Sequence, residues 1–83
     1  MKNKDLLVNS VLRADLLLSD YTLTTDTKEK ETFLEVLSNY IYAIDNNQTT
    51  LVYQKLCDSN GSEKDLYTGI LIDLLEQLKT EVA

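Results

Sequence analysis

The sequence predicts an all-α protein, a small antiparallel helical bundle of three long helices plus one short helix. The 83 residues include no proline and only two glycines, so few positions would interrupt a helix. Leucine, isoleucine, valine and tyrosine recur at steps of three and four residues, the spacing of one helix face. The expected connections are roughly two to seven residues long, and connections of that length place neighbouring helices antiparallel.

Length and composition predict a single domain over residues 1–83. Apolar residues at 43% and charged residues at 27% are typical of a globular chain and not of a disordered one. Apolar runs such as Leu16 to Leu18 are far shorter than the roughly 20 residues that a membrane-spanning helix needs. The apolar run after Lys4 ends at Asn9, too early for the core of a signal peptide. We therefore expect a cytoplasmic protein that does not bind membranes.

The first helix is predicted from Lys4 to about Ser19. Its core-facing side chains follow a 3.6-residue period and are Leu7, Val11, Ala14, Leu18 and, beyond the helix, Tyr21. The segment from Thr22 to Thr25 is polar and β-branched, which favours a connection. Leu23 is its one apolar side chain, and we expect it to anchor the connection to the bundle.

The second helix is predicted from about Thr27 to Asp45. Asp26 and Glu29 have the three-residue spacing of a capping box, which marks its start. Its main apolar seam consists of Phe33, Leu37, Tyr40 and Ile44. Asn46 and Asn47 follow, and asparagine tolerates the left-handed backbone that commonly ends a helix.

A short helix is predicted from Thr49 to Ser59, although residues 49–53 have strand-like propensity. A lone strand would leave its backbone groups unpaired, and the sequence shows no second strand. Asn60 and Gly61 are a strong helix stop, and the last helix is predicted from about Glu63 to Glu81. Its main seam consists of Tyr67, Leu71, Leu74, Leu78 and Val82. Gly69 within it suggests close helix packing or a slight bend.

The missing residue types exclude most catalytic chemistry. The chain has no histidine, which removes the usual general base and the usual zinc ligand. Cys57 is the single cysteine, and its apolar surroundings predict a buried, inert thiol. The segment from Asp58 resembles a calcium loop, but Glu63 stands where that loop needs glycine and Gly69 where it needs glutamate. We expect a non-enzymatic protein without a metal or cofactor.

The charge balance predicts a partner of opposite sign. Fourteen acidic and eight basic residues give a net charge of −6, which repels phosphate backbones and attracts basic protein surfaces. We therefore expect no direct nucleic-acid binding. Glu29, Glu31 and Glu35 are the candidate acidic contacts. The alternative is a solvated helix face, since lysine and glutamate alternate from Lys28 to Glu31.

An extra apolar row marks the first helix. Val8, Leu12 and Leu16 repeat at four-residue spacing, outside the core-facing side. Either this helix is central and contacts neighbours on two sides, or the row is exposed and binds a partner or a second copy of the chain. Tyr42 lies off the seam of the second helix near Glu35, where an exposed aromatic with an acidic rim would suit an interface.

These features predict a small acidic protein-binding module. The favoured interpretation is an inhibitor or antagonist that docks on a basic surface of a nucleic-acid-handling protein, as small acidic proteins of phages and mobile elements do. This rests on charge and size. The alternatives are a self-associating structural or regulatory homodimer that pairs through the extra apolar row, and a bacteriocin-immunity or antitoxin-like protective protein.

Overall fold

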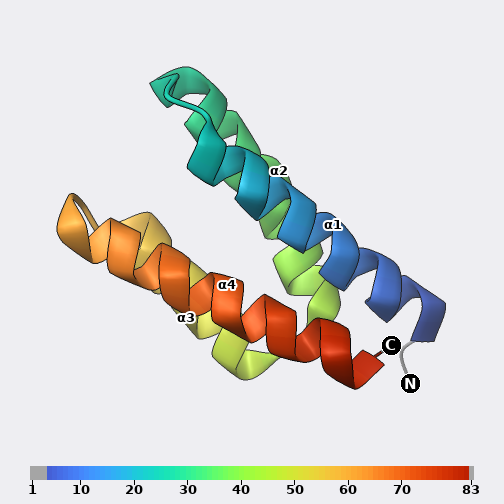
Figure 1. Ribbon diagram of the computed structural model, residues 1–83. Helices are drawn as coiled ribbons and strands as arrows, with labels where there is room; N and C mark the ends of the chain where they lie inside the picture. The colour runs from blue at the N-terminus through green and yellow to red at the C-terminus, as the bar shows by residue number, and fades with distance from the viewer. Residues whose placement is uncertain (1–3, 83) are drawn as a thin grey trace.

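A computed structural model describes residues 4–82, and they form four helices without a strand (Figure 1). The helices are α1 (Lys4–Leu23), α2 (Thr27–Ile44), α3 (Asn47–Asp58) and α4 (Ser62–Val82). The predicted all-α bundle of three long helices and one short helix is confirmed. The segment with strand-like propensity is also helical, within the 12 residues of α3.

The four helices form two antiparallel hairpins that pack against each other. α1 pairs with α2, α3 pairs with α4, and Figure 1 shows the two hairpins side by side. The hairpins meet where α1 contacts α4 and α2 contacts α3. The whole measures 37 × 20 × 18 Å. Across residues 4–82, no helix combines the length and the apolar character that crossing a bilayer requires.

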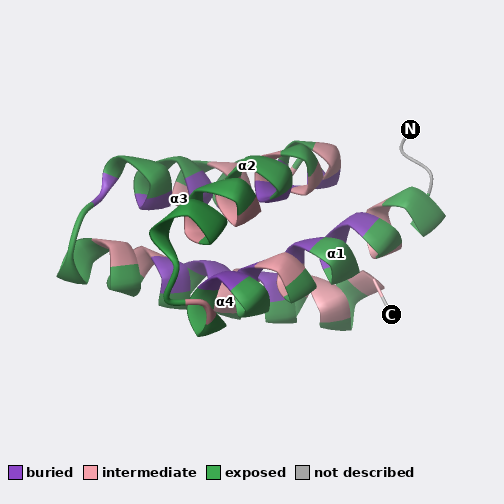
Figure 2. Ribbon diagram, turned by 90° about the horizontal axis from the view of Figure 1, so that it is seen from above, coloured by how far each residue is buried: buried purple, intermediate pink, exposed green. Residues whose placement is uncertain are grey.

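All four helices supply the core, and their buried faces turn inward, where α2 and α3 face α1 and α4 (Figure 2). The buried apolar residues are Val11, Ala14, Leu18, Tyr21, Leu37, Ile41, Ile44, Tyr53, Leu56, Leu71 and Leu75. The predicted seam of the first helix is confirmed in Val11, Ala14, Leu18 and Tyr21, whereas Leu7 is half-buried. On α4, by contrast, Leu75 is fully buried while Leu74 is only half-buried. The buried stripe is rotated toward Leu75 because α4 packs against both α1 and α3.

The first helix is longer than predicted. It continues through Thr22 and ends at Leu23, so only residues 24–26 connect it to α2. The Thr22 hydroxyl donates a hydrogen bond to the Ser19 carbonyl (2.7 Å), a bond that β-branched threonine can make without leaving the helix. Leu23 is 80% exposed, so the prediction that it anchors the connection to the bundle is wrong.

The predicted cap of the second helix is present, with one addition. The Asp26 carboxylate accepts hydrogen bonds from the backbone N–H groups of Lys28 (2.8 Å) and Glu29 (3.4 Å). The Asp26 N–H donates to the Thr24 hydroxyl oxygen (3.3 Å), and that hydroxyl donates to the Glu29 carboxylate (2.6 Å). Thr24 therefore relays the reciprocal half of the capping box.

Asp45, and not the asparagines after it, takes the left-handed backbone at the end of α2. Its φ is 55° and its ψ is 44°. Asn46 has extended backbone and caps α3, where its side-chain oxygen accepts from the Thr49 N–H (3.0 Å) and the Thr49 hydroxyl (3.1 Å). The prediction of a left-handed asparagine is wrong because Asn46 serves the next helix instead. Asn47 is already helical.

The two glycines have different roles. Gly61 has a φ of +61° in the turn between α3 and α4, a conformation that favours glycine. Gly69 lies on an exposed part of α4, and a Cβ atom there would meet no atom within 4 Å. The interpretation of Gly69 as a close-packing residue is therefore wrong.

Candidate functional site

The apolar row predicted on the first helix lies on the outward side of α1. Leu12 is 44% exposed, Leu16 is 58% exposed and Val8 is half-buried. A helix turns by about 100° per residue, so Leu12 and Leu16 point roughly opposite to the fully buried Ala14 and Leu18. The row is therefore an addition to the core-facing side and not part of it.

Leu23 extends this row. It follows Leu16 by seven residues, which is about two helical turns, and therefore lies along the same line. We call Val8, Leu12, Leu16 and Leu23 the outer row. Exposed leucines are ordinary when they are scattered singly, whereas an aligned series is a candidate contact surface.

The two neighbours of α1 leave Leu12, Leu16 and Leu23 of the outer row exposed, whereas Val8 is half-buried. An ion pair of 3.1 Å between Lys79 and Asp15 marks the flank of α1 that meets α4. The Lys30 ammonium lies 4.9 Å from the centre of the Tyr21 ring and marks the flank that meets α2. The first helix thus has neighbours on two sides, as one interpretation expected, but they do not cover the row.

The three acidic candidates fall on two flanks of α2. Glu31 and Glu35 lie one turn apart, whereas Glu29 points about 200° away from Glu31 around the helix. The Glu29 carboxylate accepts the hydrogen bond from Thr24, the residue after Leu23. Glu29 therefore lies next to the end of the outer row, whereas Glu31 and Glu35 project from another flank of α2.

Tyr42 shares the flank of Glu31 and Glu35. It is 55% exposed and follows them by eleven and seven residues, which keeps all three on one stripe. On that side of α2, the Tyr53 hydroxyl of α3 donates to the Leu34 carbonyl (2.6 Å). The predicted partner-binding residues are thus divided between the outer row with Glu29 and a second face with the aromatic and its acidic rim.

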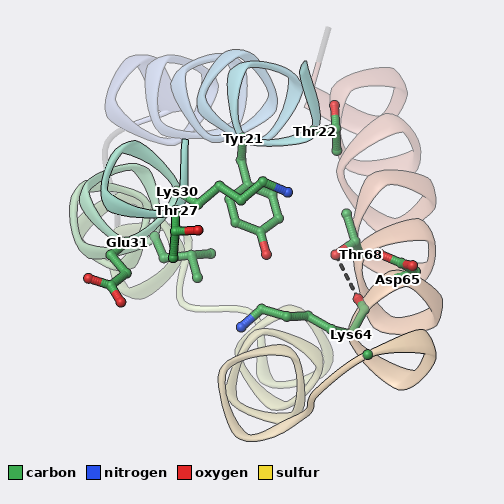
Figure 3. A pocket seen from close by; sticks show the side chains of 10 residues that line it. Tyr21, Thr22, Thr27, Lys30, Glu31, Lys64, Asp65 and Thr68 are labelled. Atoms are coloured by element: carbon green, nitrogen blue, oxygen red, sulfur yellow. Dashed lines mark hydrogen bonds between the residues drawn. The ribbon is translucent and has the colours of Figure 1, made fainter. Parts of the chain in front are cut away.

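A cavity of about 340 Å³ lies between the hairpins, where α1 ends and α2 and α4 begin (Figure 3). Its lining includes Tyr21 and Leu34 together with Lys30 and Lys64. The connection after α1 and the turn at Gly61 bring these residues to the same end of the bundle. The sequence did not predict the cavity, because Lys64 lies more than forty residues after Tyr21 and no local pattern joins them.

Tyr21 contributes both to the core and to the cavity. Its side chain is only 4% exposed, and Figure 3 shows the hydroxyl directed into the space between α2 and α4. Within residues 4–82 no hydrogen bond of this hydroxyl is found, and because no fully buried side-chain oxygen there lacks a partner, the hydroxyl oxygen is accessible from the cavity. Burial raises the pKa of Tyr21, and the negative charge of Asp65 raises that pKa further. The hydroxyl is therefore a protonated donor at neutral pH.

Lys30 and Lys64 bring two positive charges to the cavity that Tyr21 lines. In Figure 3 the Lys30 side chain extends from α2 across Tyr21, and the Lys64 side chain extends from α4 toward α2. Both are half-buried, and neither forms an ion pair with any carboxylate in the part of the chain that the structure describes. Lys79, in contrast, pairs with Asp15 (3.1 Å) and Glu76 (3.4 Å).

The predicted burial of Cys57 is wrong, because its thiol side chain is exposed. The buried face of α3 is formed by Thr49, Tyr53 and Leu56, and Cys57 follows just beyond that face. Tyr53 takes the interior position, and burial raises its pKa. The thiol therefore lies beside the core and not within it.

Within residues 4–82, no group of three or more histidine, cysteine, aspartate or glutamate side chains is arranged to hold a metal ion. Comparison with known proteins gives no match, because no family model, no curated protein and no solved structure matches this chain.

Proposed function

We propose that this protein is a non-enzymatic, acidic protein-binding module that acts in the cytoplasm. Its partner is a protein with an apolar groove and a basic rim. The observation that carries the proposal is the outer row of α1, in which Leu12, Leu16 and Leu23 are exposed along one line. An amphipathic helix that presents such a row is a recurring way to fill an apolar groove on another protein.

Charge supports the choice of partner. The net charge of −6 attracts a basic surface over several ångströms and accelerates its approach. Glu29 lies beside the end of the outer row and would meet the rim of the groove. A basic channel of a nucleic-acid-handling protein fits these properties best, and inhibition follows if the module occupies that channel.

Self-association through the outer row is the alternative from a different class. The same exposed leucines support it, because two copies related by a two-fold axis could cover each other's rows. Charge opposes it, because each copy carries −6. Sedimentation from micromolar to millimolar concentration separates the two interpretations, because a partner-binding module remains monomeric and a homodimer does not. If the partner captured through the same row is a toxin, the protein has a protective role, as an immunity protein or an antitoxin does.

A matched pair of leucines tests the outer row. Leu16 is 58% exposed and Leu66, on α4, is 59% exposed, so glutamate at either position changes the same side chain in similar solvent. Leu16→Glu is expected to reduce capture of the partner from source-cell lysate by at least tenfold, because it buries a charge in an apolar groove. Leu66→Glu is expected to leave capture unchanged. Equal loss from both variants, or from neither, contradicts the proposal.

Salt and charge reversal test the basic rim. Binding to the identified partner is expected to weaken steeply as salt rises, because exposed charges are screened. Glu29→Lys should weaken binding more than Glu35→Lys, since only Glu29 lies beside the outer row. Salt-insensitive binding, or a larger effect at Glu35, would remove the basic partner from the proposal.

A further inference from the structure

We propose that the cavity between the hairpins binds a small organic oxyanion, with its carboxylate or phosphate group held by Lys30, Lys64 and the Tyr21 hydroxyl. This site is separate from the outer row and goes beyond protein binding. It is built from the end of α1 and the beginnings of α2 and α4 (Figure 3).

The Tyr21 hydroxyl is the first observation that points to a ligand. The side chain is more than nine-tenths buried, with 4% exposed, and its ring is part of the core. Its position is therefore fixed by packing. Yet the hydroxyl is directed into the cavity and forms no hydrogen bond with any residue from 4 to 82. The ring is buried, but the hydroxyl oxygen is accessible from the cavity, so it is a fixed donor whose hydrogen bond a bound oxyanion would accept.

The charges that line the cavity select an anion. Lys30 and Lys64 extend into the space between α2 and α4, and neither has a carboxylate partner in the described part of the chain. Glu31 also lines the cavity, but its carboxylate points away from Tyr21 in Figure 3. Asp65 of α4 also lines the cavity and its negative charge acts on Tyr21, but its side chain is largely exposed to solvent. An anion would therefore meet ammonium groups on two sides within a protein whose overall charge is negative.

The size of the cavity limits the ligand to a small molecule. About 340 Å³ is at the lower end of the range of small-molecule sites, roughly 300 to 1,000 Å³. It exceeds the space that a single inorganic anion fills. Leu34 and the Tyr21 ring give one part of the lining apolar character. The ligand that fits is an oxyanion on a compact apolar body.

The test uses four probes on the isotopically labelled full chain, observed by NMR at constant ionic strength. Benzoate and phenyl phosphate carry an oxyanion on an aromatic ring, benzamide is the neutral counterpart of benzoate, and chloride is an inorganic anion. Saturable shifts of the amide signals of Gly61, Thr68 and neighbouring residues are expected with one or both oxyanions and not with benzamide or chloride. The stronger of the two oxyanions identifies the preferred head group.

Matched variants assign the binding groups. Lys64→Gln and Lys30→Gln are each expected to weaken binding and raise the dissociation constant roughly tenfold, because each removes a charge-assisted hydrogen bond. Lys28→Gln removes the same charge from α2 at an exposed position outside this cavity and should leave the constant unchanged. Tyr21→Phe retains the buried ring and should weaken binding severalfold, provided that its circular dichroism spectrum is native.

The outcomes that overturn the proposal are specific. The site does not exist as proposed if neither oxyanion produces saturable shifts at the cavity, or if benzamide binds as tightly as benzoate. An equal effect of Lys28→Gln and Lys64→Gln would show general charge attraction and not a site. Leu16→Glu, which tests the outer row, should leave oxyanion binding unchanged, so the failure of one proposal is distinguishable from the failure of the other.

Discussion

The two faces of α1 carry the same side chains in opposite environments. Leu18 is fully buried, and Leu16, two residues earlier, is 58% exposed. The inner face is explained by the fold of one chain, because α2 and α4 cover it. No helix covers Leu12, Leu16 and Leu23 on the outer face, so the fold of one chain does not explain why they are leucines. Leucine inside this helix stabilises the fold, and leucine outside is free to serve the recognition that we propose; separate substitutions measure the two roles.

The largest expected effect comes from truncating the inner leucine. Leu18→Ala should lower the free energy of unfolding by about 3 kcal/mol, because it removes buried methyl groups and leaves a cavity in the core. Leu16→Ala should change it by less than about 0.5 kcal/mol. Urea denaturation followed by circular dichroism measures both. A similar cost at Leu16 would show that the outer row is packed within the single chain, and the contrast between the two faces of α1 would not hold.

A second comparison uses two tyrosines in different environments. The Tyr53 hydroxyl donates a partly buried hydrogen bond to the Leu34 carbonyl (2.6 Å), whereas Tyr42 is 55% exposed. Tyr53→Phe should cost about 1 kcal/mol of stability, the net value of one such bond. Tyr42→Phe should cost nothing measurable by the same denaturation experiment. If the two variants were equal, the α2–α3 hydrogen bond would contribute nothing to the fold.

The two glycines differ in backbone conformation, because only Gly61 has a positive φ. Gly61→Ala should destabilise the protein by about 1 kcal/mol, because its φ of +61° is unfavourable for alanine. Gly69→Ala should stabilise it by up to about 1 kcal/mol, because Gly69 is inside a helix and has open space around it. Thermal unfolding of both variants measures the opposite signs. A loss of stability at Gly69 would indicate close packing after all.

The smallest expected effect is a loss of stability in alkali. Burial raises the pKa of Tyr21 and of Tyr53 above the ordinary value of 10.0, so the folded state holds these protons more tightly than the unfolded state. Stability therefore falls as pH rises from the ordinary tyrosine value toward the folded one. The Lys79 pKa is raised by the Asp15 carboxylate, so the favourable pairing is present below 10.5 and is also lost as pH rises.

Denaturation at pH 7, 9 and about 10.5 to 11 checks this slope. Tyr53→Phe should make it shallower, because one of the two buried hydroxyls no longer ionises. Tyr42→Phe is the matched control and should leave the slope as it is. A flat profile through this range would contradict the assignment of Tyr21 and Tyr53 to the interior.

The helices could be predicted because their signals are local. Three- and four-residue apolar spacing, the absence of proline and the Asp26 cap all act within a few turns of the chain. The wrong predictions concern side chains whose burial depends on where the helices end and how they pack. Cys57 is exposed because Tyr53 and Leu56 fill the face of α3 that meets the core. Leu23 is exposed because α1 continues past the predicted connection.

The candidate surfaces were predictable to different degrees. The position of Val8, Leu12 and Leu16 off the core-facing side follows from periodicity on one helix. The division of Glu29 from Glu31 and Glu35 also follows from helix geometry, once the buried side of α2 is known. The cavity could not be predicted, because Tyr21, Lys30 and Lys64 come from three helices and no local pattern joins them.

The sequence alone was enough to establish that the chain is helical, where all four helices begin to within two residues, and that its composition is acidic. Those properties depend on nearest turns and on composition, which folding does not change. Only the tertiary structure decided which apolar side chains remain in water and which polar groups face one another. That decision depends on how two hairpins pack, since burial is a property of pairs of helices and not of one.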